Sequence, residues 1–322
     1  MIITMPDTDT RAIAAELVSI REWGAQVTTG RVLTLIVVAD ANDDIEGIIA
    51  ATNDASREHP SRVLVMVSGD PTVKPSKVDA EIRIGGDAGA SEIVLIRLTG
   101  EVADHVEAVV TPLLLPDTPI VAWWPGTAPV NPSADPIGRI AARRITDALY
   151  DPPEDSIYRR RNHYRPGDSD MAWSRITQWR GIVASTLDQP PHEGVLDAEV
   201  HGPADSPSVD LAAGWLADRF GVNIVRQSTG QDAVPVDDEG RECIAITRVV
   251  LFRSRSKITV EVRDAETLSV SVDGSHHGLV ALGRRSRADC LAEELRHLDP
   301  DLAYARALRG LNRVRYVDAI TD

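Results

Sequence analysis

Residues 113–126 read LLLPDTPIVAWWPG, and this stretch decides the fold of the first half of the chain. Its three prolines fix backbone angles and remove amide donors, which excludes a helix. The apolar run 120–124 has the length of a strand that is buried on both faces of a parallel sheet. Because successive side chains of a strand point to opposite faces, Trp123 and Trp124 cannot share one core, and either could instead anchor a partner.

The segments around this strand alternate between helical and extended patterns. The apolar runs at 32–39 and 63–67 are predicted strands, and the apolar side of residues 45–52 predicts a helix between them. A strand, a helix and a strand with short connections indicate a parallel pair. We therefore predict an α/β domain over residues 1–150 with a mostly parallel sheet.

Binding groups in open α/β sheets gather just past the carboxyl ends of strands, so the Pro125-Gly126 turn is expected at the ligand edge of this domain. Residues 143–149 fit either a strand or the end of a helix. The other predicted elements of the domain are helices at 10–24 and 101–115, a short helix from Pro136, and strands at 79–84 and 92–98.

The second half of the chain shows a different pattern. Residues 151–190 predict a linker followed by a connecting helix at 170–187. Apolar and polar residues alternate strictly at 257–263 and 267–272, which is typical of antiparallel strands with one face in water. We therefore predict an α+β domain with antiparallel strands over residues 191–322. Its other predicted elements are strands at 195–200, 222–226 and 243–251, and helices at 208–220, from Ser286 and from Pro300.

Composition excludes several classes of protein. The chain has 322 residues, 43% of them hydrophobic, and a net charge of −15, which argues against a nucleic-acid or anionic-membrane binder. No apolar run is long enough to span a bilayer, and the first residues lack the pattern of a signal peptide. Cys243 and Cys290 do not make a disulfide framework, so we expect two unbridged thiols and a cytoplasmic location.

No stretch carries a recognised catalytic, cofactor or metal pattern. Residues 85–89, GGDAG, lack the spacing of a dinucleotide loop and the lysine of a Walker loop, and predict a hairpin turn. Residues 274–278, GSHHG, lack the spacing of a nucleophile elbow. Adjacent histidines on extended backbone point apart, so this segment is also predicted as a turn. We predict no catalytic residue, no cofactor and no metal.

The segment SREHPSR at 56–62 is a possible anion site. Arg57 and Arg62 could clamp a carboxylate or phosphate, with His59 between them. The alternative is a solvated helix C-terminus, where cations complement the helix dipole. The second interpretation is favoured, because this segment enters the sheet from the amino ends of the strands.

A basic island at 158–165 includes Arg159, Arg160 and Arg161. It is either a solvated linker or a docking strip for an acidic partner protein. Tyrosines among the arginines could suggest base stacking, but the net charge opposes nucleic-acid binding.

Two tryptophans and two arginines follow at Trp173, Arg175, Trp179 and Arg180. Trp and Arg are enriched at the energetic centres of protein interfaces. These residues therefore indicate either a packed core or a surface for a protein partner.

Four stretches together resemble one family. They are SREHPSRVLV, LLLPDTPIVAWWPG, the following RRITD, and AWSRITQWR. In this order they are similar to the glucose-6-phosphate dehydrogenase assembly protein family, OpcA. The resemblance implies a non-catalytic chain that binds glucose-6-phosphate dehydrogenase and supports its oligomerisation or activity in the oxidative pentose phosphate pathway.

The competing hypothesis is an enzyme or sensor for a sugar phosphate. Its site would lie past the strand ends of the first domain, near Trp124, Asp147 and either Arg143 or Arg144. A ligand that binds the folded chain raises its melting temperature by mass action, which would separate the two hypotheses.

Overall fold

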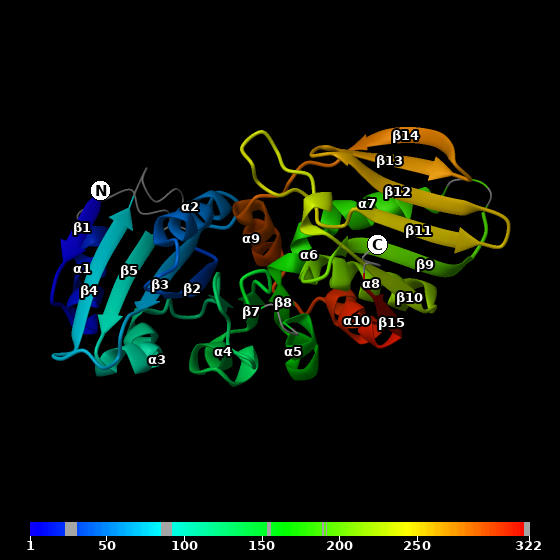
Figure 1. Ribbon diagram of the computed structural model, residues 1–322. Coiled ribbons are helices and arrows are strands. Elements are labelled where there is room, and N and C mark those ends of the chain that lie inside the picture. The colour runs from blue at the N-terminus through cyan, green and yellow to red at the C-terminus, as the bar shows by residue number, and fades with distance from the viewer. Residues whose placement is uncertain (23–30, 85–91, 153–155, 189, 191, 319–322) are drawn as a thin grey trace. The chain divides into compact units, whose positions relative to one another are not determined.

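The computed structural model describes residues 1–22, 31–84, 92–152, 156–188, 190 and 192–318. The chain divides into two compact units, each built around a mixed sheet with helices (Figure 1). Unit 1 comprises residues 1–151, 165–171 and 287–300, and unit 2 comprises residues 152–164, 172–286 and 301–322. The sequence predicts divisions near residues 150 and 190. Unit 1 includes, in addition, two short stretches from later in the chain.

The sheet of unit 1 has the order β1-β4-β5-β3-β2-β6-β7-β8. It is parallel from β5 to β8, whereas β4 pairs antiparallel with both β1 and β5. The parallel part follows from the predicted strand, helix and strand pattern. The strands are β1 (Ile2–Met5), β2 (Leu33–Asp40), β3 (Ser61–Ser68), β4 (Lys77–Ile84), β5 (Glu92–Thr99), β6 (Ile120–Trp123), β7 (Arg143–Thr146) and β8 (Asp168–Asp170).

Helices cover both faces of this sheet. One apolar core joins the sheet to α2 (Ile45–Ser56) and to α9 (Arg287–Arg296), which returns from the end of the chain. The other core joins it to α1 (Thr10–Glu22), to α3 (Val106–Val110) and to α4 (Pro136–Ile140). Alternate residues of each central strand enter alternate cores, which is why these strands read as continuous apolar runs.

Trp123 and Trp124 show this alternation. Trp123 belongs to the core under α2 and α9, and Trp124 belongs to the core on the opposite face. Both side chains are buried, with exposed fractions of 0% and 2%. The prediction that they point to opposite faces is confirmed. The expectation that one of them is available to a partner is wrong, because a sheet covered on both faces offers each tryptophan its own core.

The sheet of unit 2 has the order β14-β13-β12-β11-β9-β10-β15. It is antiparallel from β14 to β9, as predicted, but β10 pairs parallel with both β9 and β15. The β9–β10 pair is parallel because helix α8 connects the two strands. The strands are β9 (Val195–Pro203), β10 (Ile224–Thr229), β11 (Arg248–Arg253), β12 (Lys257–Asp264), β13 (Thr267–Val272), β14 (Ser275–Ala281) and β15 (Val314–Val317).

The longest described helix of unit 2 connects β9 to β10 and packs on both strands. This helix, α8 (Pro207–Phe220), begins with proline in its first turn and ends at Gly221, whose φ of 69° is left-handed. Its N-cap is Ser206, so the helix begins one residue before the predicted start at 208. The other helices are α5 (Ser156–His163), α6 (Met171–Arg175), α7 (Thr177–Thr186) and α10 (Leu302–Gly310).

Several predicted elements differ from the structure. The helix predicted at 101–115 is divided into η2 (Glu101–Asp104), α3 and η3 (Thr111–Leu113), because His105 adopts a non-helical backbone and Pro112 lies in the last turn. The helix predicted at 170–187 is divided into α6 and α7 at Ile176. The strand predicted from Cys243 begins only at β11.

The turn predicted around Gly274 is shorter than expected. Asp273 and Gly274 have positive φ angles and form it, but the two following histidines belong to strand β14. The turn predicted at 85–89 lies outside the described residues. Neither Cys243 nor Cys290 is in a disulfide bond in the described part of the chain: Cys290 is buried in the core that α9 covers, and Cys243 is half-buried in unit 2.

Candidate functional site

The strand order of unit 1 fixes where a ligand site would be expected. The chain runs from β2 through α2 to β3 on one side of β2, whereas β6 pairs with the other side of β2. The edge past the carboxyl ends of β2 and β6 is therefore the topological switch point, where open α/β sheets bind their ligands. The connections at this point are residues 41–44 and 124–127.

Carboxylates occupy the connection between β2 and α2. Asp44 caps α2, its Oδ1 accepting from the amide of Gly47 at 3.0 Å, and Asp43 Oδ2 accepts from the amide of Asp40 at 2.7 Å. A Cβ added to Gly126 would lie 2.7 Å from Asp43 Oδ1, so the connection after β6 lies against the same carboxylate. Dinucleotide sites place a phosphate on the free amides of such a connection. Here negative side chains accept from amides at this position and repel a phosphate.

Buried aspartates also hold the turn after β7. Asp170 accepts from Thr146 Oγ1 at 2.6 Å and from the amide of Ala148, and Asp147 accepts from the amide of Leu149 at 3.3 Å. Asp147 and Asp170 are both 0% exposed. Asp147, which the sugar-phosphate hypothesis places in a site, therefore serves the local backbone.

Arg143 and Arg144 lie on β7 and are bonded inside unit 1. Arg143 donates to Glu294 of α9 and to the carbonyl of Asp299, and Ser169 Oγ donates to the same Glu294 carboxylate at 2.6 Å. Arg144 donates to Asp168 and to the carbonyls of 141 and 166. Both arginines are buried, so the cations that a sugar phosphate would need are engaged by carboxylates of the fold.

The arginine and tryptophan pairs at 173–180 form part of the core of unit 2. The guanidinium of Arg180 lies 3.5 Å from the ring centre of Trp173, whose Nε1 donates to Asp301 Oδ2 at 2.8 Å. Trp179 meets Trp215 edge to face, with ring centres 6.0 Å apart. Trp173 and Trp179 are buried, so neither is the exposed anchor that the sequence allows; Arg175 and Arg180 are half-buried.

The basic island forms α5 rather than a structureless linker. Tyr158 Oη lies 2.8 Å from Tyr316 Oη of β15, and Arg161 donates to Asn312. Arg160 is buried, whereas Arg159 and Arg161 are half-buried. These contacts fix α5 within unit 2 and leave parts of two of its three arginines accessible.

The possible anion site at 57–62 does not assemble. Arg62 is buried and donates through Nε to Glu92 Oε1 at 2.6 Å, and Arg31 approaches the other oxygen of the same carboxylate at 2.6 Å. Arg57 is exposed and pairs with Asp54 of its own helix. His59 is half-buried between them. The exposure of Arg57 agrees with the favoured interpretation, a solvated helix C-terminus. Arg62, in contrast, is part of a buried ion pair that the sequence did not indicate.

Unit 2 contains a buried arginine within strand β10. Arg226 is 0% exposed and donates to Asp210 of α8 at 3.0 Å and to the carbonyls of Gly202 and Pro203. Burial raises the pKa of Asp210 to about 6, although the nearby Arg226 opposes this rise. The hydroxyl of Tyr316 adds a further hydrogen bond to the same carboxyl group.

Asp210 gives unit 2 a specific pH dependence. Because its pKa is higher in the folded chain than the ordinary value of 3.8, its contribution to stability is complete below that value and is lost as the pH rises through about 6. We expect the stability of Asp210→Asn relative to wild type to be higher at about pH 7.5 than at about pH 4.5, since asparagine does not titrate. Urea unfolding midpoints of both proteins at the two pH values measure this, and an unchanged difference would contradict it.

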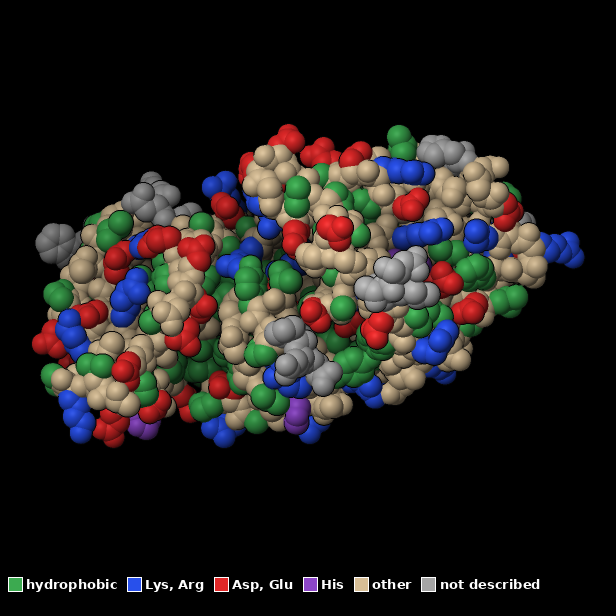
Figure 2. All heavy atoms as spheres, in the orientation of Figure 1, with side chains coloured by type: hydrophobic (Ala, Val, Ile, Leu, Met, Phe, Trp, Pro, Cys, Tyr) green, Lys and Arg blue, Asp and Glu red, His purple; other side chains and the backbone are tan. Residues whose placement is uncertain are grey.

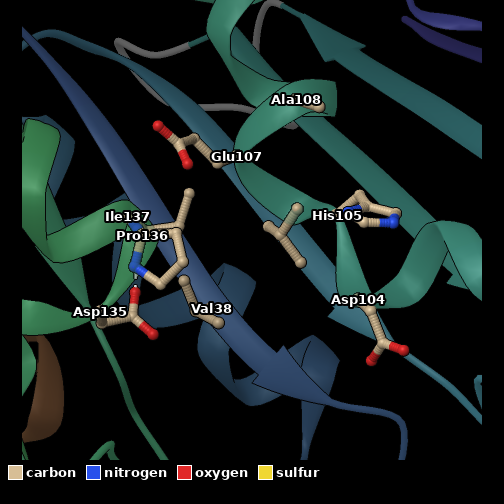
Figure 3. A pocket seen from close by; sticks show the side chains of 9 residues that line it. Val38, Asp104, His105, Glu107, Ala108, Asp135, Pro136 and Ile137 are labelled. Atoms are coloured by element: carbon tan, nitrogen blue, oxygen red, sulfur yellow. Dashed lines mark hydrogen bonds between the residues drawn. The ribbon is translucent and has the colours of Figure 1, made fainter.

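A pocket in unit 1 lies at the ligand edge and is lined by polar as well as apolar side chains. It has a volume of about 330 Å³ and lies between α3 and α4, beside the carboxyl half of β2 (Figure 3). Val38 and Ile137 supply apolar walls, and Asp104, Glu107 and Asp135 supply carboxylates. Sequence reasoning missed it because the two helices are short and lie far apart in the sequence. The signal in the sequence was the close spacing of two carboxylates, Asp104 and Glu107, at the start of a predicted helix.

Two kinds of site are not found in the described part of the chain. No group of three His, Cys, Asp or Glu side chains there is placed to hold a metal ion. None of the helices that the structure describes has the length and apolar character that a membrane crossing requires. Figure 2 shows acidic and basic side chains interspersed over the face that is drawn.

Comparison with family models decides the relationship of the chain. Residues 52–162 match the model described as the glucose-6-phosphate dehydrogenase subunit N-terminal domain, and residues 166–308 match the model of the C-terminal domain. The chain belongs to the OpcA family. The resemblance seen in its four sequence stretches is thereby confirmed, since all four lie within the matched residues. A comparison with curated protein sequences gave no significant match.

Solved structures similar to this OpcA family member are distant. Glucose-6-phosphate 1-dehydrogenase from Mycobacterium avium has 11% identity and a TM-score of 0.43, covering 90% of this chain and 94% of its own. Biliverdin reductase from Synechocystis sp. PCC 6803 has 10% identity and a TM-score of 0.41, covering 87% and 96%. An inositol dehydrogenase homologue from Azotobacter vinelandii has 11% identity and a TM-score of 0.36, covering 90% and 88%. These likenesses assign no activity.

Proposed function

We propose that this chain is a non-catalytic subunit that binds a glucose-6-phosphate dehydrogenase and supports its oligomerisation or activity in the cytoplasmic oxidative pentose phosphate pathway. The observation that carries this proposal is the match of two successive domains, over residues 52–308, to models of a glucose-6-phosphate dehydrogenase subunit. The identity of the partner is thus inferred from the family. The residues on the surface of the chain indicate how the chain acts on that partner.

The residues at the ligand edge of unit 1 support a function that does not involve binding a phosphate group. Asp40, Asp43 and Asp44 line the switch point, and Arg143 and Arg144 are engaged in buried ion pairs. A sugar phosphate or dinucleotide would therefore meet repulsion where these folds usually supply amides and cations. Glucose 6-phosphate, 6-phosphogluconate and nicotinamide dinucleotides are expected to leave the melting temperature of the chain unchanged.

Some of the predicted contact residues keep accessible surface. Arg159 and Arg161 on α5, together with Arg175 and Arg180, are half-buried and can each extend part of a guanidinium to a partner. Arg160 and the tryptophans at 123, 124, 173 and 179 are buried and are not part of this proposal.

The proposal predicts that adding this chain at micromolar concentration raises the rate of a purified glucose-6-phosphate dehydrogenase or converts it to a larger species. Enzyme rate and sedimentation velocity, measured with and without the chain, test this directly. An acidic protein of similar size serves as the control for unspecific effects. An unchanged rate, an unchanged size and no co-sedimentation would contradict the proposal.

A further inference from the structure

The pocket between α3 and α4 combines an apolar interior with a negative margin. Its interior is formed by Val38 of β2, Val106 of α3 and Ile137 of α4, together with Ala108 and Pro136. Figure 3 shows Glu107 and Asp135 on one side of these apolar residues, and Asp104 and His105 on the other. A volume of about 330 Å³ is within the range of sites that enclose a side chain or a small ligand.

The carboxylates at the margin are available. Asp135 uses Oδ1 to accept from the amides of Ile137 and Gly138, at 2.9 and 3.3 Å, and so caps α4. Its other oxygen, and the side chains of Asp104 and Glu107, make no hydrogen bond or ion pair with any described residue. No lysine or arginine is among the described residues that line the pocket. The fold leaves this negative charge uncompensated, in contrast to the buried ion pairs elsewhere in unit 1.

We propose that this pocket receives a basic side chain, arginine in the first instance, from the protein partner of the chain. The proposal rests on the proposed function for the identity of that partner. An arginine side chain matches the pocket in two ways, because its aliphatic stem fits the apolar interior and its planar guanidinium can donate to two carboxylates at once. A phosphate or carboxylate ligand would meet repulsion, and the described residues form no metal-binding group.

The decisive variant neutralises the margin without changing its shape. Asp104→Asn, Glu107→Gln and Asp135→Asn together remove three charges, and asparagine caps a helix as well as aspartate does. We expect this variant to keep its melting temperature and to bind the dehydrogenase about tenfold more weakly or worse, since contacts to a desolvated charge dominate many interfaces. Its affinity should also depend less on salt than that of the wild type.

A matched control removes the same number of charges elsewhere. Asp188, Asp232 and Asp238 are exposed residues of unit 2, and Asn at all three changes the net charge equally. This control should bind within about twofold of wild type, because surface charges at a distance are screened. If the pocket variant and the control lose affinity by the same factor, the pocket has no role of its own and the proposal is overturned.

A second arm does not need the dehydrogenase. Agmatine carries a guanidinium on a four-carbon stem and serves as the probe. In methyl NMR spectra we expect it to shift the signals of Val38, Val106 and Ile137 in the wild type and not in the neutralised variant. If the dehydrogenase does not bind the wild type, the proposed function fails. The pocket is then judged by agmatine alone, and an absence of methyl shifts overturns its assignment as a cation site.

Discussion

Replacing Glu294 by alanine is expected to lower the free energy of unfolding of unit 1 by about 3–5 kcal/mol. The Arg143 and Glu294 side chains are 5% and 3% exposed, and Ser169 also donates to Glu294. Alanine would leave the Arg143 guanidinium buried without its counter-charge, and this uncompensated charge accounts for the large expected effect. The same change removes the bond that holds α9 against β7.

Urea unfolding followed by tryptophan fluorescence measures the effect, because Trp123 lies in the core that α9 covers. The matched control is Arg296→Ala on the same helix, which breaks an exposed pair with Glu58 and should cost less than about 1 kcal/mol. The double change Arg143→Met with Glu294→Leu should recover most of the lost stability, since it removes both charges. Equal losses for Glu294→Ala and Arg296→Ala would contradict this account.

Gly310→Ala is expected to destabilise unit 2 by about 3 kcal/mol, at the upper end of overpacking effects. Helices α8 and α10 pack closely at two glycines, Gly214 and Gly310. A Cβ at Gly310 would lie 1.9 Å from the carbonyl oxygen of Gly214, and a Cβ at Gly214 would lie 2.3 Å from that of Ala307. Backbone atoms cannot rotate away as side chains can, so the helices must separate.

The control for this prediction is the same substitution at Gly181 in α7. A Cβ there meets nothing within 4 Å, so Gly181→Ala should stabilise the chain by roughly 0.5–1 kcal/mol through helix propensity. Opposite signs for one chemical change at two helical glycines would establish close approach as the cause. A neutral result at Gly310 would show that α8 and α10 tolerate a wider separation.

Local patterns predicted the parallel part of unit 1 well. The run 120–124 between prolines indicated a strand covered on both faces, and Trp123 and Trp124 indeed enter opposite cores. The pattern could not show whether helices cover each face of the sheet well enough to bury a tryptophan. That cover comes from α9 on one face and from α3 and α4 on the other. The sequence of an amphipathic helix shows that it has an apolar side, but it does not show which sheet that side packs against.

The candidate sites were less predictable, because the partner of each charge is distant in the sequence. Arg62 pairs with Glu92, 30 residues later, and Arg143 pairs with Glu294, 151 residues later. A cluster of arginines read from sequence alone indicates an anion site or a partner surface equally well. The carboxylates of the pocket were not predicted for the same reason. Asp104 and Asp135 are distant in the sequence and line one pocket only because two short helices pack against each other.

The return of α9 to unit 1 has a consequence for synthesis on the ribosome. All strands of the first sheet have been translated by residue 170, yet the helix that places Cys290, Leu291 and Leu295 in its core comes more than a hundred residues later. At elongation rates of about 5–20 residues per second, that delay is on the order of ten seconds, during which one apolar face of the nascent unit lacks part of its cover. A chain that stops before α9 would therefore expose this face to chaperones and proteases and would not persist as a shortened subunit.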